Sequence, residues 1–256
     1  MLKLQIPSQR QLLEDIALCL VFFTRLPLPR ADFRGRSLAA AIWAAPVAGL
    51  AVALAGALVY AVGTKLGLAE GPAAALTLAA ILLATGCLHE DGLSDVADGF
   101  GGGKTRDRKL EIMRDSRIGA YGACALGISL LIRWSVLSGF AGPAHVFWAL
   151  IAAQAASRGL LGAFMLLLPP ARADGLSVDA GTVTAETAIA GAVLGAAALL
   201  ALGVGAAFAA LILLGLLAAF RALCLNQVGG QTGDTVGALQ QLGEIAILLV
   251  ASVSLS

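Results

Sequence analysis

The chain has 256 residues, of which 59% are hydrophobic and only 13% are charged, and its formal net charge is +1. Its mean hydropathy of +0.90 is too high for a water-soluble domain, whose outer surface must be largely polar. The small net charge excludes the usual type of nucleic-acid-binding protein, which carries a clear basic surplus. The composition therefore predicts an integral membrane protein with no nucleic-acid partner.

The first predicted element is a helix at 11–23. It is amphipathic at its start and too short to cross a bilayer, so we assign it to the membrane interface as part of an N-terminal segment, 1–37. Apolar runs that approach the ~20 residues of a transmembrane helix follow at 38–62, 72–88, 118–139, 144–168 and 238–255.

The longest apolar run, 187–220, exceeds the length of one transmembrane helix. Its central Gly203-Val204-Gly205 predicts a tight turn between two short spans, because glycine permits a reversed backbone. We predict an all-α fold: a polytopic integral membrane helix bundle with about six transmembrane helices plus the N-terminal interfacial helix. The whole chain, 1–256, then forms one membrane-embedded catalytic domain.

Lysine and arginine in short loops mark the cytoplasmic side of a membrane protein. They gather before the first span (Arg25, Arg30, Arg34, Arg36) and before the third (Lys104, Arg106, Arg108, Lys109, Arg114, Arg117). This bias predicts that the polar segments 89–117, 169–186 and 221–237 all face the cytoplasm. We expect them to form one active site on that side, with 89–117 and 221–237 as loops.

The stretch "HEDGLSDVADG" concentrates ionisable residues at the end of the second apolar run. If the helix of that run continues past Leu88, then Asp91, Asp95 and Asp98 lie within about 60° of one helix face. Like charges at this spacing destabilise a helix. The pattern therefore predicts that a cation binds between the three carboxylates.

Oxygen ligands without sulfur favour Mg²⁺, with Mn²⁺ as an alternative and zinc as a poorer match. The predicted metal ligands are Glu90, Asp91, Asp95, Asp98 and Asp115. The predicted catalytic residues are His89, Asp91, Asp95 and Asp98. Two alternatives stay open: the carboxylates are solvated charges of a surface loop, and His89 is a hydrogen-bonded structural residue.

The glycine-rich "GFGGGKT" follows the acidic stretch. It is not a nucleotide-binding P-loop, because Gly99 and Gly103 stand one residue too close together and no strand precedes them. We interpret it as a flexible hinge that carries Lys104 and Arg106 toward an anionic group. A linker without a ligand is the alternative.

Further polar residues are candidates for substrate or phosphate binding. Arg117 in "RDSRIGAYG" suits bidentate phosphate binding, although Asp115 and Arg117 could also anchor the third span at the headgroups. Asp234 is either a ligand or a helix N-terminal charge. Arg158, near the middle of its span, should face the bundle interior with a carboxylate or ligand as partner, and Arg133, nearer a span end, can snorkel. The predicted binding set is Lys104, Arg106, Arg117, Arg158 and Asp234.

Taken together, "LHEDGLSDVADGFGGG", "EIMRDSRIGAYGA" and "GGQTGDTVGA", with "FFTRLPLP" near the start, resemble the cobalamin synthases, the adenosylcobinamide-GDP ribazoletransferases. The resemblance covers most of the chain from Phe22 to Gly237. It implies a Mg²⁺-dependent integral membrane transferase of late cobalamin biosynthesis, located in a bacterial cytoplasmic (inner) membrane with its active site facing the cytoplasm. Its implied substrates are adenosylcobinamide-GDP and α-ribazole or α-ribazole 5′-phosphate, its products adenosylcobalamin (or its 5′-phosphate) and GMP, and its other partner the lipid bilayer; an oligomer stays possible.

Three alternative functions remain open. One is another membrane phosphotransferase of the CDP-alcohol type, whose Asp-Gly start is echoed by Asp91-Gly92, and a second is an aspartate-rich prenyl transferase. The third is a secondary transporter. A transporter needs ionisable residues at the bilayer midplane within broken helices, whereas the sequence places the acidic cluster at a span end.

Overall fold

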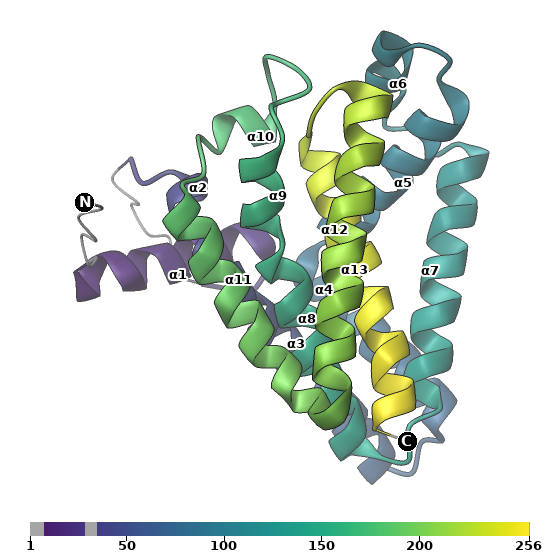
Figure 1. Ribbon diagram of the computed structural model, residues 1–256. Coiled ribbons are helices and arrows are strands. Elements are labelled where there is room, and N and C mark those ends of the chain that lie inside the picture. The colour runs from purple at the N-terminus through teal and green to yellow at the C-terminus, as the bar shows by residue number, and fades with distance from the viewer. Residues whose placement is uncertain (1–7, 29–34, 256) are drawn as a thin grey trace.

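The structure is a computed structural model that describes residues 8–28 and 35–255, and this part of the chain is a bundle of helices (Figure 1). Within those ranges there is no β-strand, only an isolated bridge between Pro170 and Gln231. The all-α class predicted from the sequence is confirmed. Arg30 and Arg34, which contribute to the predicted orientation, lie outside the described residues.

Helix α1 (Gln9–Phe23) lies crosswise to the long helices of the bundle (Figure 1). Asp15, on its buried side, accepts hydrogen bonds from Arg36 Nε at 2.6 Å and from Trp43 Nε1 at 2.8 Å. These contacts hold α1 against the start of the first span. The crosswise orientation agrees with the predicted interfacial helix.

The described residues include five helical segments that are long and apolar enough to cross a membrane, or up to six if a bent pair counts as one span. This number confirms the prediction of about six transmembrane helices. The five segments are Leu38–Lys65, Ala120–Ser138, Pro143–Leu167, Ala185–Val228 and Gly233–Ser254.

The first span consists of α2 (Leu38–Ala41), a 3-10 turn η1 (Ile42–Ala44) and α3 (Ala45–Lys65). The following helices are α4 (Glu70–Thr85), α5 (Leu88–Gly102), α6 (Arg106–Ile112), α7 (Ala120–Ser138), α8 (Pro143–Gly159), α9 (Leu161–Leu167) and α10 (Leu176–Asp179). The chain continues with α11 (Ala185–Leu199), the 3-10 turn η2 (Leu200–Gly205), α12 (Ala206–Val228) and α13 (Gly233–Ser254).

The longest apolar segment folds back on itself, as predicted. Gly203 has φ 55° and ψ −120°, a conformation open to glycine, and it separates α11 from α12. The two helices run in opposite directions in Figure 1.

The predicted loop 221–237 is mostly helical, which corrects the sequence prediction. Helix α12 continues to Val228, and α13 begins at Gly233 after a capping box between Thr232 and Thr235. Hydropathy locates apolar side chains, whereas helix ends follow capping groups, so both helices extend beyond their apolar runs.

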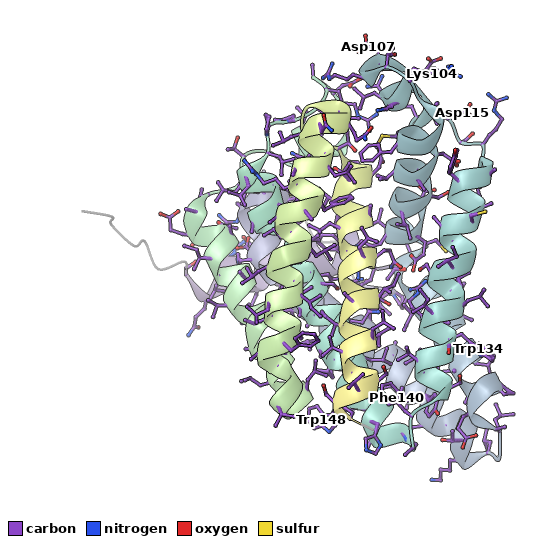
Figure 2. All side chains as sticks on the ribbon, turned by 45° about the vertical axis from the view of Figure 1, so that its right-hand side comes forward. Lys104, Asp107, Asp115, Trp134, Phe140 and Trp148 are labelled. Carbon is purple, nitrogen blue, oxygen red and sulfur yellow. The ribbon has the colours of Figure 1, made fainter. Side chains whose placement is uncertain are left out.

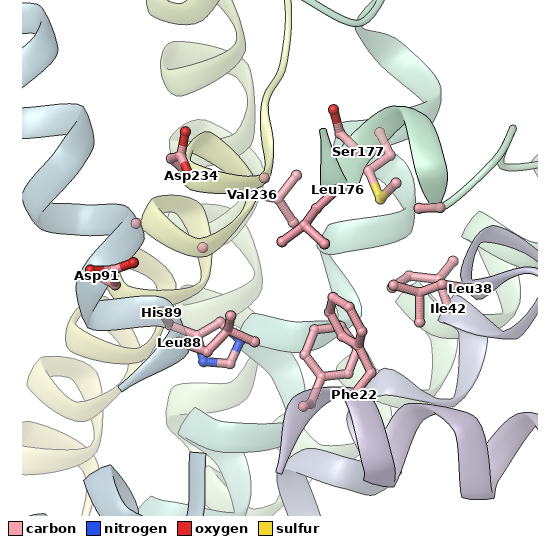
Figure 3. A pocket seen from close by; sticks show the side chains of 16 residues that line it. Phe22, Leu38, Ile42, Leu88, His89, Asp91, Leu176, Ser177, Asp234 and Val236 are labelled. Atoms are coloured by element: carbon pink, nitrogen blue, oxygen red, sulfur yellow. The ribbon is translucent and has the colours of Figure 1, made fainter. Parts of the chain in front are cut away.

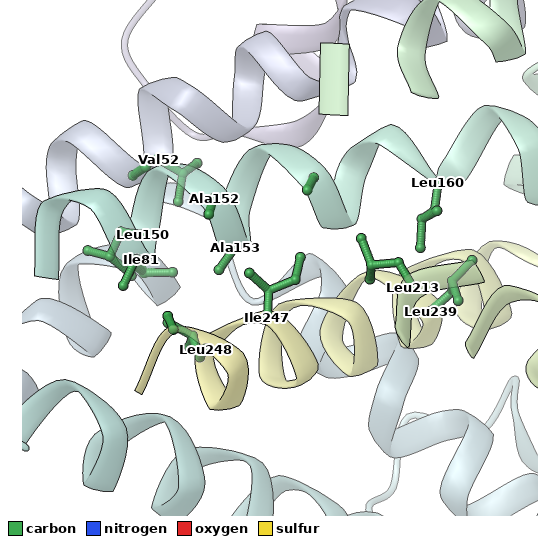
Figure 4. Close-up of a cluster of buried hydrophobic side chains, with 14 of the residues drawn as sticks. Val52, Ile81, Leu150, Ala152, Ala153, Leu160, Leu213, Leu239, Ile247 and Leu248 are labelled. Carbon is green, nitrogen blue, oxygen red and sulfur yellow. The ribbon is translucent and has the colours of Figure 1, made fainter. Parts of the chain in front are cut away.

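The core of the bundle is made by α3, α8, α12 and α13 (Figure 4). Val52, Leu150, Leu213 and Ile247 are among the buried side chains that pack there. Helix α5 packs against α13 on one side and α7 on the other. The acidic stretch therefore belongs to the packed bundle.

The second span does not continue straight into the acidic stretch, as the sequence analysis assumed, because α4 and α5 are bent by 90°. Gly86 (φ 64°) and Cys87 (φ 58°) both adopt the left-handed conformation that ends α4. Arg25 reinforces the break, since its backbone N–H donates to the Ala84 carbonyl at 2.6 Å. Residues 89–117 are consequently not one loop but contain α5 and the short α6.

The two ends of the bundle differ in chemistry (Figure 2). Lys104, Asp107 and Asp115 lie at one end, and Trp134 and Trp148 lie toward the other. The indole Nε1 of Trp134 donates to the Gly71 carbonyl at 2.9 Å. Tryptophan is typical of either membrane–water interface, so Trp134 and Trp148 are consistent with a bundle that spans the bilayer.

Candidate functional site

A pocket opens where α1, α5, α10 and α13 meet (Figure 3). It contains about 660 Å³ of empty space, part of which is solvent at its open mouth. Figure 3 shows two different walls: Asp91 and Asp234 lie on one side, and Leu38 and Ile42 lie on the other.

The acidic wall joins two segments far apart in the sequence. Asp91 is exposed on α5, and Asp234 lies in the first turn of α13. The helices touch at Gly92, where a Cβ atom would lie only 2.6 Å from the Asp234 carbonyl oxygen. Glycine at 92 therefore lets the two carboxylates line one pocket.

Asp95 follows one turn after Asp91 and is partly buried. It lies close enough to Asp91 and Asp234 for their negative charges to act on it, and Arg172 partly offsets them. This concentration of negative charge at the pocket is what the sequence pattern predicted for Asp91 and Asp95. Asp234 joins it from another helix.

Arg172 is a site residue that the sequence analysis missed. Its Nη2 donates to Asp234 Oδ2 at 2.9 Å, and its buried Nη1 has no hydrogen-bond partner in the part of the chain that the structure describes. Arg172 is the one basic residue of the segment 169–186, which the sequence analysis had already placed on the active side. This single basic residue, in "PPARADG", was the sequence feature that could have identified Arg172 as a site residue.

Asp98 was predicted on the same face of α5, but its carboxylate contacts the start of α7 and does not line the pocket. Its Oδ2 accepts from the Gly119 N–H at 2.7 Å, and its Oδ1 accepts from the Gly122 N–H at 2.9 Å. Both donors belong to the N-terminus of α7, where a carboxylate is favourable. A Cβ at Gly122 would lie 2.3 Å from Asp98 Oδ2, which accounts for glycine in "IGAYG".

Glu90 points away from the aspartates into a buried ion-pair cluster. Arg133 Nη1 lies 3.0 Å from Glu90 Oε1 and 3.1 Å from Glu244 Oε1, and Gln241 Nε2 donates to Glu90 at 3.1 Å. Glu90 was predicted to be a metal ligand together with the aspartates, but the fold turns its side chain away from Asp91 and Asp95. The prediction that Arg133 snorkels is wrong, because its guanidinium is fully buried between two carboxylates.

His89 lies at the buried edge of the pocket. Its ring stacks on Phe23 with centroids 5.8 Å apart, and its Nδ1 is 3.5 Å from Arg158 Nη2. Arg158 faces the bundle interior, as predicted, and its Nη1 donates to the Gln154 carbonyl at 2.9 Å. Among the described residues it forms no ion pair with a carboxylate, so the partners differ from those expected.

The other predicted binding residues lie at the loop end of the bundle and do not line the described pocket. Arg106 Nε donates to the Val228 carbonyl at 2.9 Å, and its Nη2 donates to the Ala171 carbonyl, so it joins α6 to two other segments. Lys104 is exposed. Arg117 Nε donates to Asp115 at 3.0 Å, and the guanidinium holds the pKa of Asp115 at about 2.

The donor set at the pocket suits a hard divalent cation. No three His, Cys, Asp or Glu side chains of the described chain gather closely enough to hold a metal by themselves. Mg²⁺ does not require such a cage, because it is usually bound by one or two carboxylates, water and substrate phosphates. The neighbouring carboxylates of Asp91, Asp95 and Asp234 fit that pattern.

The family profile for cobalamin-5-phosphate synthase matches residues 15–252. The chain belongs to this family. It is 75% identical to an adenosylcobinamide-GDP ribazoletransferase of Mesorhizobium japonicum, over 97% of this chain and 96% of the relative. It is 53% identical to a protein of the same name from Bradyrhizobium diazoefficiens, over 95% of each chain. No solved structure matches the chain.

Membership of the cobalamin-5-phosphate synthase family identifies the chain as a transferase of cobalamin biosynthesis with membrane-spanning helices. The resemblance inferred from the three sequence motifs is confirmed. Family membership also sets aside the CDP-alcohol phosphotransferase, prenyl transferase and transporter alternatives.

Proposed function

We propose that the chain is a Mg²⁺-dependent transferase that joins adenosylcobinamide-GDP to α-ribazole or α-ribazole 5′-phosphate. The products are adenosylcobalamin, or its 5′-phosphate, and GMP. The observation that carries this proposal is the acidic wall of the pocket, where Asp91 of α5 and Asp234 of α13 line one cavity beside Arg172. The names of the relatives supply the substrates.

The reaction is a displacement at phosphorus. The ribose 3′-hydroxyl oxygen of α-ribazole bonds to the phosphorus that carries the cobinamide, and the bond from that phosphorus to the oxygen bridging to GMP breaks. GMP leaves with the bonding electron pair. The hydroxyl proton passes to a carboxylate of the acidic wall, which acts as a general base.

Arg172 binds the pyrophosphate of adenosylcobinamide-GDP. Its guanidinium already lies at the acidic wall, and its unpartnered Nη1 is a free donor for a phosphate oxygen. Arginine suits this role because its planar donors match phosphate oxygens. Asp91, Asp95 and Asp234 are the residues that would hold Mg²⁺, and the bound ion would neutralise charge on the phosphate oxygens.

The active site lies on the cytoplasmic side of a bacterial inner membrane. The Lys/Arg-rich end of the bundle supports this orientation under the positive-inside rule, and the compared relatives are bacterial proteins. Cysteine labelling of the intact cell tests it: a probe that cannot cross the membrane should label a cysteine introduced at Asp107 only after the cell is opened.

The activity is tested with purified protein in detergent, by measuring GMP release from adenosylcobinamide-GDP. Release should require both α-ribazole and Mg²⁺, and EDTA should abolish it. Release that is independent of α-ribazole would indicate hydrolysis, and release that survives EDTA would contradict the metal assignment. The variant Arg172→Gln should raise KM for adenosylcobinamide-GDP about 10- to 100-fold through the lost charged hydrogen bonds, whereas Arg108→Gln, on exposed α6, should not.

A further inference from the structure

The pocket has an apolar wall that the phosphate chemistry does not use. Phe22 and Phe23 at the end of α1 line it, together with Leu38, Ile42, Val236 and Leu176 from four other elements. In Figure 3 the ring of Phe22 lies across the pocket from Leu176 and Val236. A flat apolar group placed between them would contact side chains from both sides.

We propose that this apolar wall binds the base of α-ribazole, so that the pocket is the site of the nucleoside acceptor rather than of the guanosine. This inference rests on the proposed function. The base of α-ribazole is 5,6-dimethylbenzimidazole, an apolar bicyclic ring whose one free hydrogen-bonding atom is an acceptor nitrogen. Its ribose then extends toward Asp91 and Asp234, where the hydroxyl must lose its proton.

Guanine is the competing occupant, and its chemistry does not match this wall. Its ring edge carries several hydrogen-bond donors and acceptors, and burying them among apolar side chains without partners is costly. The side chains of the apolar wall, Phe22, Phe23, Leu38, Ile42, Leu176 and Val236, offer no partners for these groups, so the wall favours the apolar base. Ser177 is the polar side chain on the side of the pocket away from Asp91 and Asp234.

His89 supplies one hydrogen-bond donor at the edge of the pocket. Its Nδ1 lies 3.5 Å from Arg158 Nη2, and a guanidinium can only donate, so Nδ1 is the acceptor of this contact. The ring proton of His89 therefore sits on Nε2. This atom is buried and has no hydrogen-bond partner among the described residues, although His89 lines the pocket.

The Nε2 donor of His89 matches the acceptor nitrogen of dimethylbenzimidazole. The stacking of His89 on Phe23 holds the imidazole in place at the end of the apolar wall. Helix α1 thus contributes to the site through its last two residues. The site accordingly includes the N-terminal interfacial helix α1, although none of the acidic residues that line the pocket belongs to this helix.

The lining of the pocket decides how the two substrates would share it. The apolar wall takes the base of α-ribazole, and the side with Asp91 and Asp234 takes the ribose hydroxyl and the pyrophosphate. The corrinoid and its guanosine then remain outside the apolar wall.

The test is equilibrium binding of nucleosides to the purified full chain, without adenosylcobinamide-GDP. α-Ribazole should bind most tightly, the benzimidazole riboside without its two methyl groups about 10-fold more weakly because less apolar surface is buried, and guanosine and GMP weakest. The indole analogue, in which a CH group replaces the acceptor nitrogen, should also bind about 10-fold more weakly. GMP that competes with α-ribazole at equal concentration would overturn the proposal.

A variant sharpens the test. Phe22→Ala should raise KM for α-ribazole about 10-fold and leave KM for adenosylcobinamide-GDP unchanged, while Phe208→Ala, which removes an exposed ring from α12, should change neither. A rise in KM for adenosylcobinamide-GDP alone would assign the wall to guanosine. If α-ribazole binds as expected but no GMP is released, the proposed reaction is wrong and the assignment of the apolar wall stands. If GMP is released but Phe22→Ala changes neither KM, the proposed reaction stands and the assignment of the apolar wall is wrong.

Discussion

Helix α5 presents carboxylates in two directions, and the two groups have opposite surroundings. Glu90 is buried and pairs with Arg133, which also contacts Glu244. The carboxylate of its neighbour Asp91 is exposed at the pocket and forms no hydrogen bond or ion pair with another side chain in the described part of the chain. The comparison shows that adjacent acidic residues can differ in role: the paired carboxylate joins α5 to α7 and α13 in a buried ion-pair cluster, and the unpaired one is available to a ligand.

The first way to test this difference is to neutralise the pocket side. Asp91→Asn and Asp95→Asn should each lower the turnover number about 10²- to 10⁴-fold, the size of a lost general base or metal contact. The thermal unfolding midpoint should stay the same or rise, because repulsion between like charges is reduced. GMP release and thermal unfolding in detergent measure the two effects.

Asp107→Asn is the matched control, since the Asp107 side chain is 92% exposed on α6. It should change neither quantity. Full turnover in both Asp91→Asn and Asp95→Asn would remove the acidic wall from the mechanism.

The second test addresses the buried side. Arg133→Met leaves Glu90 and Glu244 buried without a counter-charge, and should lower the free energy of unfolding by about 3–5 kcal/mol. Combining it with Glu90→Gln and Glu244→Gln removes the unpaired charges and should restore most of that loss. Denaturant titration followed by circular dichroism measures both. Equal destabilisation of the single and triple variants would contradict the attribution of the loss to the unpaired charges of Glu90 and Glu244.

The third test concerns the contact between Asp98 and α7. Gly122→Ala places a Cβ atom where Asp98 Oδ2 now lies, and the displacement should cost about 1–3 kcal/mol of unfolding free energy. Gly127→Ala, on the same helix, meets no atom within 4 Å and should be neutral or stabilise by up to about 1 kcal/mol. Thermal unfolding of the two variants side by side checks the difference, and equal midpoints would show that Asp98 does not fix α7.

The smallest effect is expected at the exposed pair of Asp115 and Arg117. Because the pKa of Asp115 is lowered to about 2, any stabilisation from this pair is complete above the unfolded pKa of about 3.9 and is lost as the pH falls toward 2. Because the pair is exposed to solvent, Arg117→Gln should leave turnover unchanged and lower the thermal unfolding midpoint only slightly, by the same amount at every pH between 5 and 9. A tenfold loss of turnover would instead place Arg117 at the phosphate, as its motif predicts.

The membrane spans could be predicted from the sequence because crossing a bilayer depends on local apolarity over one stretch of chain. The helical spacing of Asp91 and Asp95 was also a local property, and the structure keeps Asp91 in the pocket lining and Asp95 close to it. The direction of Glu90 was not predictable in this way, because its partner Arg133 lies 43 residues away and that residue's second partner, Glu244, a further 111.

The same limit explains Arg172 and the bend after α4. Arg172 meets Asp234 across 62 residues, so its contact has no local signature. The bend depends on Gly86 and on Arg25 packing over it, whereas hydropathy records how apolar a segment is and not its direction. Tertiary contacts thus decided which of the predicted acidic residues share a site.

The central claim is that Asp91 of α5 and Asp234 of α13 form one cation site at the pocket. Electron paramagnetic resonance of Mn²⁺, used in place of Mg²⁺, tests it most directly on the full chain in detergent with inorganic pyrophosphate present. Asp91→Asn and Asp234→Asn should each abolish tight Mn²⁺ binding, and Asp107→Asn should retain it. Unchanged Mn²⁺ affinity in both Asp91→Asn and Asp234→Asn would contradict the account.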